Sequence, residues 1–238
     1  MIVALITARG GSKNPPRKNV RILKGKPLVA YPLIAVKESK YIDKIFLSTD
    51  SDEIAKIGNK YGAVTIQRPK ELARDESKHE DAILHGYNWI KSNVKGEHDN
   101  DIIIVMCGNC ATITTSIIDE GIELLKNDNN LDSCSIVAKI NENNPSRAYK
   151  VNEDGVLYTM FKDLVSDSDR DSIGQIYTHV GVWILKARCL QKDYPLGEYP
   201  YRWIGSKSYP LVQDYGWDID NELDFAKTEW WLETYGEK

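Results

Sequence analysis

Hydrophobic and polar positions divide the chain into short apolar segments separated by longer segments with helical periodicity. Several apolar segments are hydrophobic throughout rather than alternating, which is typical of strands buried on both faces of a mostly parallel sheet. The predicted strands cover residues 2–7, 44–50, 64–68, 101–106, 134–140 and 180–186.

Helical periodicity fills the intervals between these strands. Pro27 suits the first turn of the first helix. One of Thr49, Asp50 or Ser51 can cap the second helix, and Gly62 can end it. Strands that alternate with helices predict an α/β fold with a doubly wound, mostly parallel sheet. The predicted helices cover residues 27–38, 51–61, 76–93, 114–127 and 221–235.

The segment 141–178 interrupts this alternation. Its first half, "NENNPSRAYKVNEDGVLYTMF", is typical of irregular chain followed by a β-hairpin with a turn near "EDG". Its second half is polar and predicted to be exposed. A chain of 238 residues suits one large domain. We therefore interpret residues 1–238 as a single domain and 141–178 as a protruding arm.

Composition excludes several classes of protein. The 42% hydrophobic and 28% charged residues are ordinary for a soluble protein. The apolar runs are too short to span a bilayer, and the start of the chain is the reverse of a signal peptide, so we expect a cytoplasmic protein without a membrane partner. A net charge of -4 argues against general nucleic-acid binding. Four cysteines are too few for a disulfide framework, so we expect free thiols.

The acidic total conceals a basic start, because no Asp or Glu occurs before Glu38. The loop "ARGGSKNPPRKN", from Ala8 to Asn19, directly follows the first predicted strand. In α/β sheets, the loops at the carboxyl ends of strands bind ligands. This position favours a binding role over the alternative, a surface turn with solvated cations.

The residues of this loop are those that hold phosphate groups. Gly10 and Gly11 allow the backbone to approach a ligand and to present N–H groups. Arg9 can contact phosphate oxygens in a bidentate manner, and Lys13 and Lys18 supply point charges. The spacing matches neither the Walker loop nor the dinucleotide fingerprint. We predict a different kind of polyphosphate cradle.

An acidic segment, "QDYGWDIDNELDF" at 213–225, lies near the other end of the chain. If the chain is extended there, the carboxylates of Asp218 and Asp220 point to the same face. Two carboxylates together with phosphate oxygens and water suit Mg²⁺. The alternative is a helix N-terminus, which favours acids but explains Asp220 and Glu222 better than Asp218. A cradle and a metal pair brought together would support nucleotidyl transfer.

Several motifs in order resemble the acylneuraminate cytidylyltransferases, which are the CMP-sialic acid synthetases and their relatives for legionaminic and pseudaminic acids. The resemblance implies a Rossmann-like nucleotidyltransferase fold and transfer of CMP from CTP to a 2-keto sugar acid, with Mg²⁺ and release of pyrophosphate. It also implies a homodimer whose arm reaches the partner's site. The motifs are "ITARGGSKNPPRKN", "KPLVAYPLIAV", "IFLSTDSDEIAKIGNKYGA", "RPKELARDES" and "WDIDNELDF".

The same resemblance assigns roles to individual residues. Asp218 and Asp220 would be the metal ligands, and the catalytic residues would be Arg9, Lys18 and Asp218. The residues implied to bind the nucleotide are Ala8, Gly10, Gly11, Ser12, Asn19, Arg68 and Ser77.

The chain departs from this family on the acceptor side. The family typically has L-Q-P-T-S-P-x-R where this chain has "VMCGNCATIT" at 105–114, so Met106 replaces Gln and Thr112 replaces Arg. Val180 also stands where the family usually has Asn. We hypothesise an acceptor other than an ordinary sialic acid, such as an unusual sugar acid or a phosphonate. The candidate acceptor contacts are Gly108, Asn109, Arg147 and His179.

Three alternatives stay open at this point. The pair Cys107 and Cys110 forms a C-x-x-C motif, which is half of a zinc site or a redox couple; no second pair follows, so small residues lining a pocket are favoured. The protein could belong to the broader NTP-sugar pyrophosphorylase class, which the R-G-G-S-K loop disfavours. It could also be a non-catalytic nucleotide-binding relative, against which the retained Asp218 and Asp220 argue.

Overall fold

A twisted sheet of seven strands forms the centre of the computed structural model, which describes residues 1–139, 145, 148–161 and 174–236. All neighbouring strands are parallel except β10, which is antiparallel to both β6 and β7. The predicted α/β class with a mostly parallel sheet is therefore confirmed. The strand order is β11 (Ser208–Gln213), β7 (Ser133–Lys139), β10 (Tyr177–Lys186), β6 (Ile102–Cys107), β1 (Ile2–Thr7), β4 (Lys44–Thr49) and β5 (Val64–Gln67).

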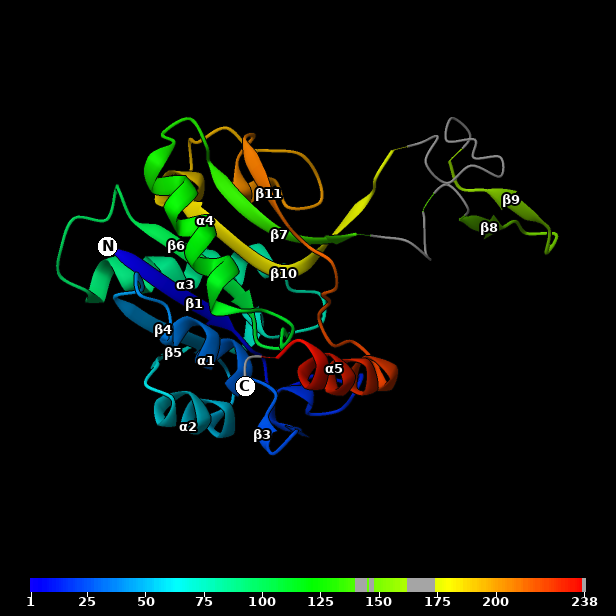
Figure 1. The fold of residues 1–238 in the computed structure, drawn as a ribbon, viewed down its shortest axis with the longest axis horizontal. Coiled ribbons are helices and arrows are strands. Elements are labelled where there is room, and N and C mark those ends of the chain that lie inside the picture. The colour runs from blue at the N-terminus through cyan, green and yellow to red at the C-terminus, as the bar shows by residue number, and fades with distance from the viewer. Residues whose placement is uncertain (140–144, 146–147, 162–173, 237–238) are drawn as a thin grey trace.

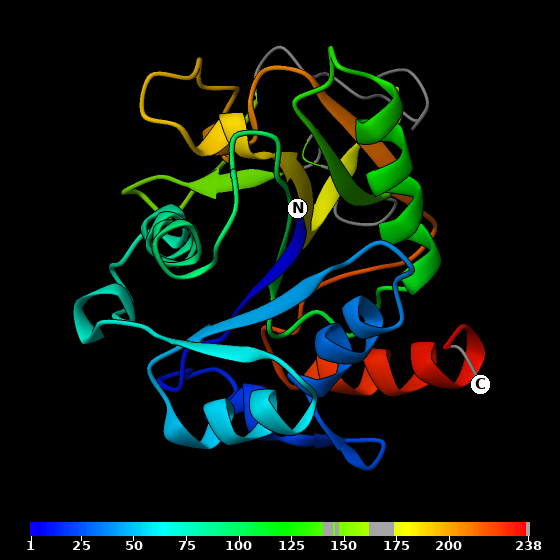
Figure 2. The same ribbon diagram turned by 90° about the vertical axis from the view of Figure 1, so that its left-hand side faces the viewer.

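Helices cover both faces of this sheet (Figures 1 and 2). Alternate residues of β1 show this division: Ala4 packs in the core beneath α1 and α4, while Leu5 packs in the core beneath α3. Because both faces are buried, the side chains from Ile2 to Ile6 are apolar on both faces, as the continuous apolar pattern predicted. The helices are α1 (Ala30–Lys37), α2 (Asp52–Lys60), α3 (His79–Asn93), α4 (Thr115–Asn127) and α5 (Glu222–Thr234).

The strand order reverses direction at the middle of the sheet. From β1 the chain first adds β4 and β5 on one side and then crosses to β6 on the other. The chain therefore leaves β1 and β6 in opposite directions along the sheet. Doubly wound sheets bind ligands at the carboxyl ends of the strands at such a switch point. The start of the antiparallel β10 lies at the same edge.

Two details of the predicted elements are wrong. Pro27 lies in a small hairpin of β2 (Ile22–Leu23) and β3 (Lys26–Pro27), and α1 begins only at Ala30. Backbone bonds from Leu28 N–H to the Arg21 carbonyl and from Val29 N–H to the Asn19 carbonyl keep this segment out of the helix. The edge strand β11 was not predicted, because only Leu211 in it is buried.

Other local signals are confirmed. Ser51 is the N-cap of α2, where its Oγ accepts from the Ile54 N–H, and Gly62 follows the helix with a φ of 91°. Within the predicted arm, β8 (Tyr149–Val151) and β9 (Leu157–Thr159) form a hairpin that turns near Gly155. Figure 1 shows this exposed hairpin projecting from the body.

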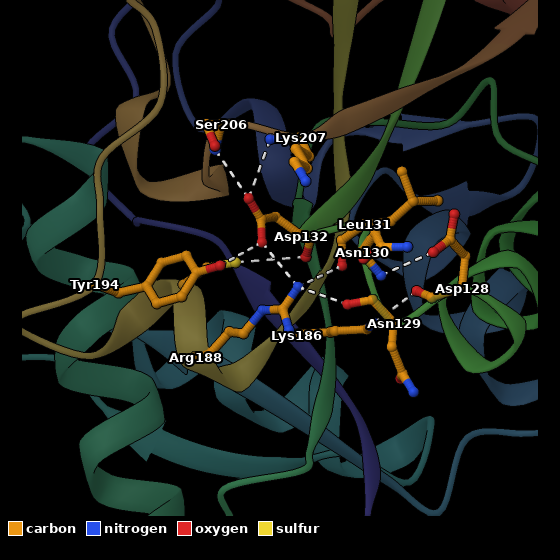
Figure 3. Close-up of polar contacts among 11 residues, drawn as sticks. Asp128, Asn129, Asn130, Leu131, Asp132, Lys186, Arg188, Tyr194, Ser206 and Lys207 are labelled. Atoms are coloured by element: carbon orange, nitrogen blue, oxygen red, sulfur yellow. Dashed lines mark hydrogen bonds and ion pairs between the residues drawn. The ribbon is translucent and has the colours of Figure 1, made fainter.

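A buried carboxylate directly before β7 fixes the long loop that follows β10 (Figure 3). Asp132 is 2% exposed. Its Oδ1 accepts from Tyr194 and Arg188, and its Oδ2 accepts from the Ser206 and Lys207 N–H groups. Burial alone would raise the pKa of Asp132, but these hydrogen bonds outweigh it and hold the pKa below its ordinary value.

We expect Asp132→Asn to lower the free energy of unfolding by about 2 kcal/mol at pH 7, because the new amide N–H2 group faces donors instead of accepting from them. Urea unfolding measures this change. Because the pKa of Asp132 is lowered in the folded state, the wild-type protein has its full extra stability above the ordinary pKa of an Asp side chain. This extra stability is lost as the pH falls through the folded-state pKa. The exposed Asp193→Asn is the matched control; an equal loss in both variants would contradict the role of Asp132.

Candidate active site

The loop Ala8–Asn19 leaves β1 and folds over the carboxyl edge of the sheet. Its Gly10 N–H donates to Asp50 Oδ1 at 2.8 Å, and a Cβ on Gly10 would lie only 2.8 Å from the Ser51 Cβ. A glycine is therefore needed there for close packing. Ser12 closes the loop, since its Oγ accepts from the Lys18 N–H at 2.8 Å and its carbonyl accepts from the Arg17 N–H. The Gly11 backbone remains exposed toward solvent.

Cations of this loop are paired with carboxylates from distant segments. Asp75 binds Arg9 Nη1 at 2.8 Å and Lys13 Nζ at 2.5 Å. Hydrogen bonds from Lys13 and then Arg9 lower the pKa of Asp75. Exposed ion pairs of this kind contribute little to stability, so phosphate oxygens can replace the carboxylate. Sequence reasoning missed Asp75, although it lies within the quoted "RPKELARDES".

Lys18 connects the loop to the acidic segment. Its Nζ donates to the Ile219 carbonyl and to Asp220 Oδ1, both at 2.7 Å. The side chain of Lys18 is 15% exposed. The predicted cradle and the predicted carboxylate pair therefore lie at one site.

The segment after β6 holds Asp218 in place. Asn109 Nδ2 donates to Asp218 Oδ2 at 3.3 Å and to the Ile219 carbonyl at 2.9 Å, and the Asn109 carbonyl accepts from the Ile219 N–H. Burial and then the neighbouring charge of Asp220 raise the pKa of Asp218. The amide of Asn109, a predicted acceptor contact, is thus engaged in positioning Asp218.

The carboxylate pair is a fit for a hard divalent cation. Burial and the charge of Asp220 raise the pKa of Asp218, so a bound cation would stabilise its charged form. No cluster of three or more His, Cys, Asp or Glu side chains suited to a metal occurs among the described residues. A metal here would need ligands from the substrate and water, as Mg²⁺ commonly does. The alternative helix-start role falls mainly on Asn221 and Asp224, which form the capping box of α5.

Asn19 and Gly108 lie side by side in the loops that follow β1 and β6. Asn19 is 5% exposed, and its Nδ2 donates to the Arg9 carbonyl at 3.0 Å. Its Oδ1 has no hydrogen-bond partner among the described residues and lies beside Gly108. The Gly108 N–H donates to the Thr7 carbonyl, so its backbone continues the edge of the sheet.

Arg68 and Ser77 make local hydrogen bonds. The buried Arg68 donates from Nε to Ser48 Oγ and from Nη2 to the Ser48 carbonyl. Burial lowers the pKa of Arg68 to about 10, so the group remains cationic at neutral pH. Ser77 Oγ donates to the Glu71 carbonyl at 2.6 Å. Their roles toward a nucleotide remain predictions.

Most of the departures in "VMCGNCATIT" are buried. Met106 packs in the core and Thr112 is fully buried, exchanging hydrogen bonds with the Trp217 backbone. Cys110 is buried, and its thiol donates to the Val180 carbonyl at 2.9 Å. Cys107 is the partly exposed member of the pair. The buried side chains of Cys110 and Thr112 therefore contact the backbone of neighbouring segments and are not exposed to a ligand.

Of the other acceptor candidates, His179 lies at the start of β10 and packs against Trp183 and Tyr201. Sequence reasoning missed Tyr201, which follows an irregular segment without a recognisable pattern. Arg147 lies outside the described residues. A separate cavity of about 880 Å³ lies between α1, the start of α4 and α5, and none of the predicted nucleotide, metal or acceptor residues lines it.

Comparison with known proteins identifies the relatives of this chain. A family model described as cytidylyltransferase matches residues 3–194. The N-acylneuraminate cytidylyltransferase of Escherichia coli is 27% identical over 226 residues, which cover 94% of this chain and 50% of that protein. The pseudaminic acid cytidylyltransferase of Campylobacter jejuni is 29% identical over 94% of both chains. The chain thus spans about half the length of the first of these relatives.

A solved structure shares the fold over nearly the whole chain. The CMP:2-keto-3-deoxy-manno-octonic acid synthetase complexed with CTP superposes with a TM-score of 0.68 at 16% identity, covering 98% of each chain. Within the described part of this chain, no helix has the length and apolar character needed to cross a membrane.

The four thiols are expected to differ in reactivity, because Cys107 alone among them is not buried. Native protein should react rapidly with a disulfide reagent at one thiol per chain, and Cys107→Ser should abolish this reaction. Burial raises the pKa of the other three thiols and protects them further. Spectroscopic titration counts the thiols. Stoichiometric zinc in the purified protein, with Cys107 protected until a chelator is added, would instead establish the zinc alternative.

Proposed function

Because this chain belongs to the cytidylyltransferase family, we propose that it transfers CMP from CTP to a hydroxyl group of an anionic acceptor and releases pyrophosphate. One observation carries the proposal: Lys18 contacts Asp220 and the Ile219 carbonyl, so the basic loop and the carboxylate pair are next to each other. They meet at the switch point of the sheet, where an α/β fold binds ligands.

The basic loop is suited to the triphosphate. Arg9 and Lys18 would stabilise the charge on the phosphates and on the leaving pyrophosphate. Arg9 would exchange Asp75 for phosphate oxygens, whereas the third N–H of Lys18 can bind phosphate while Asp220 is kept. Gly11 is exposed and can present its N–H to a ligand. The buried Oδ1 of Asn19 has no hydrogen-bond partner among the described residues, and a hydroxyl or amino group of the nucleotide could supply one.

Asp218 and Asp220 would hold Mg²⁺. When bound, Mg²⁺ supplies charge neutralisation for the reacting phosphate and lowers the pKa of a coordinated hydroxyl. The chain's own contribution is to position these carboxylates: Asn109 holds Asp218, and Lys18 holds Asp220.

For the acceptor, the relatives favour a 2-keto sugar acid of the kind that their names specify, and the altered segment at 105–114 favours one other than an ordinary sialic acid. A phosphonate with a hydroxyl group is a further candidate of similar charge. A base or acceptor of the broader NTP-sugar pyrophosphorylase class, or loss of catalysis, are the alternatives that an acceptor panel separates.

We also propose a homodimer in which the arm packs against a partner molecule, in the cytoplasm. Support comes from the hairpin of β8 and β9, which projects from the body and exposes several large apolar side chains. A group of exposed apolar side chains is typical of a surface that binds another protein. The exposed residues are Tyr149, Val151, Val156, Leu157 and Tyr158.

Asp218→Asn is expected to reduce Mg²⁺-dependent pyrophosphate release by about 100-fold or more, because one of two carboxylate ligands is lost. Release from CTP is measured over a panel of N-acetylneuraminate, legionaminic acid, pseudaminic acid, 2-keto-3-deoxy-manno-octonic acid and hydroxyphosphonates. Asp214→Asn is the control from the same acidic segment, with a side chain 79% exposed, and should retain full activity. Unchanged turnover in Asp218→Asn would refute the metal assignment.

Lys18→Gln is expected to weaken CTP binding roughly 10- to 100-fold, the loss of a charge-assisted hydrogen bond to phosphate. Calorimetric titration with CTP and Mg²⁺, without acceptor, measures this directly. Lys24→Gln removes a neighbouring cation that instead pairs with Glu233 on α5 and should bind CTP normally. Equal affinities for all three proteins would remove Lys18 from the cradle.

A further inference from the structure

A β-bulge in β10 brings two aromatic side chains together at the edge of the candidate site. The pairing of β10 with β7 shifts register between His179 and Trp183. In a regular strand, residues four positions apart are separated by about 13 Å. Here the ring centroids of His179 and Trp183 lie 5.7 Å apart. Bulges redirect side chains in this way next to active sites.

The segment that departs from the family holds this bulge. Gly181 has a φ of 78°, and a Cβ on it would lie 2.5 Å from Cys110 Sγ. The Cys110 thiol also donates to the Val180 carbonyl. The bulge therefore depends on a glycine at 181 and on the small thiol at 110, so the altered "CGNC" segment and the position of His179 are physically coupled.

The contact with Trp183 selects one protonation form of His179. Trp183 Nε1–H donates to His179 Nδ1 at 3.0 Å. Because an indole nitrogen only donates, Nδ1 must be unprotonated, and a neutral ring must carry its proton on Nε2. Burial lowers the pKa of His179, which favours the neutral ring at pH 7.

The Nε2 side of the ring remains available for a ligand. His179 is partly exposed, and its Nε2 has no hydrogen-bond partner among the residues that the structure describes. The ring packs edge-on against Tyr201, with centroids 4.6 Å apart. Tyr201 is itself partly exposed and packs on Trp183. Burial raises the pKa of Tyr201, and charges at Cys107 and Asp218 raise it further. Because Val182 pairs with Met106, the start of β10 that carries His179 lies at the carboxyl end of β6, where the loop with Asn109 begins.

We propose that the bulge in β10 fixes His179 as a neutral hydrogen-bond donor whose Nε2–H binds an oxygen atom of the acceptor and so determines which sugar acid is used. The inference rests on the proposed transfer of CMP to a sugar acid and adds the residue and the atom that read the acceptor. His179 takes no proton in this role; it is an acceptor-binding residue, and Trp183 is a positioning residue.

Steady-state kinetics test the contact with the best acceptor of the panel of four sugar acids. His179→Phe should raise the acceptor KM about tenfold, the loss of one neutral hydrogen bond, and leave the KM for CTP within twofold. His179→Gln should recover most of this loss, because its amide N–H2 reaches the position of Nε2. His85→Gln, on α3, is the control and should behave as wild type.

Two kinetic outcomes separate this inference from the proposed function. Wild-type enzyme that uses an acceptor while His179→Phe keeps the same KM for it would overturn the inference and leave the function standing. Wild-type enzyme that uses none of the acceptors would overturn the proposed function, and the inference would fall with it.

NMR of protein labelled with ¹⁵N-histidine tests the tautomer without any activity measurement. The wild-type spectrum at pH 7.5 should show His179 protonated on Nε2 only. In Trp183→Phe, which removes the donor but keeps an aromatic ring, His179 should become a mixture of tautomers. A wild-type ring protonated on Nδ1, or on both nitrogens, would overturn the inference even if Trp183→Phe failed to fold.

Discussion

The contact of Lys18 with the Ile219–Asp220 segment joins parts of the chain that are about 200 residues apart, and it brings the basic loop to the carboxylate pair. Lys18 is the first of three cations in this region that pair with carboxylates of the C-terminal segment. Arg21 pairs with Glu222 and also stacks on the Phe225 ring at 4.1 Å, and Lys24 pairs with Glu233. Beneath these pairs, Ile219 and Phe225 are buried with residues of the β2–β3 hairpin region. Burial supplies the stability, and the ion pairs set the register of α5 on the basic loop.

The same arrangement explains how a strongly basic loop is accommodated in an acidic chain. Arg9 and Lys13 share Asp75, Arg17 binds Glu53, and Lys18 binds Asp220. Apart from Lys18, these groups are substantially exposed, so each pair is weak and exchangeable. A triphosphate brings several negative charges at once and can replace these carboxylates without leaving a buried charge unpaired. The carboxylates thus keep the loop ordered while leaving its cations accessible to a ligand.

The sequence was sufficient for the strands that form the centre of the sheet, because continuous apolar runs such as 2–7 and 101–106 have few alternatives to burial on both faces. It also located the basic loop and the Asp218–Asp220 pair, whose residue types are directly tied to phosphate and metal chemistry. It failed for β11, an edge strand in which one residue is buried, and for the β2–β3 hairpin, where backbone bonds override a helix signal at Pro27. Asp75 and Tyr201 were missed because their contacts are made across the fold rather than along the chain.

The departures from the family pattern act through the backbone more than through their own side chains. Met106, Cys110 and Thr112 are buried, so they cannot form direct polar contacts with an acceptor as exposed Gln or Arg side chains would. What Cys110 does is pack against Gly181 and bind the Val180 carbonyl, which fixes the bulge that redirects His179. Gly181 and Cys110 are packed so closely that a Cβ on Gly181 would lie 2.5 Å from the Cys110 Sγ. A bulkier residue at 110 would therefore crowd Gly181. We therefore propose that selectivity for the acceptor arises in β10, the strand that the altered residues support, rather than in those residues themselves.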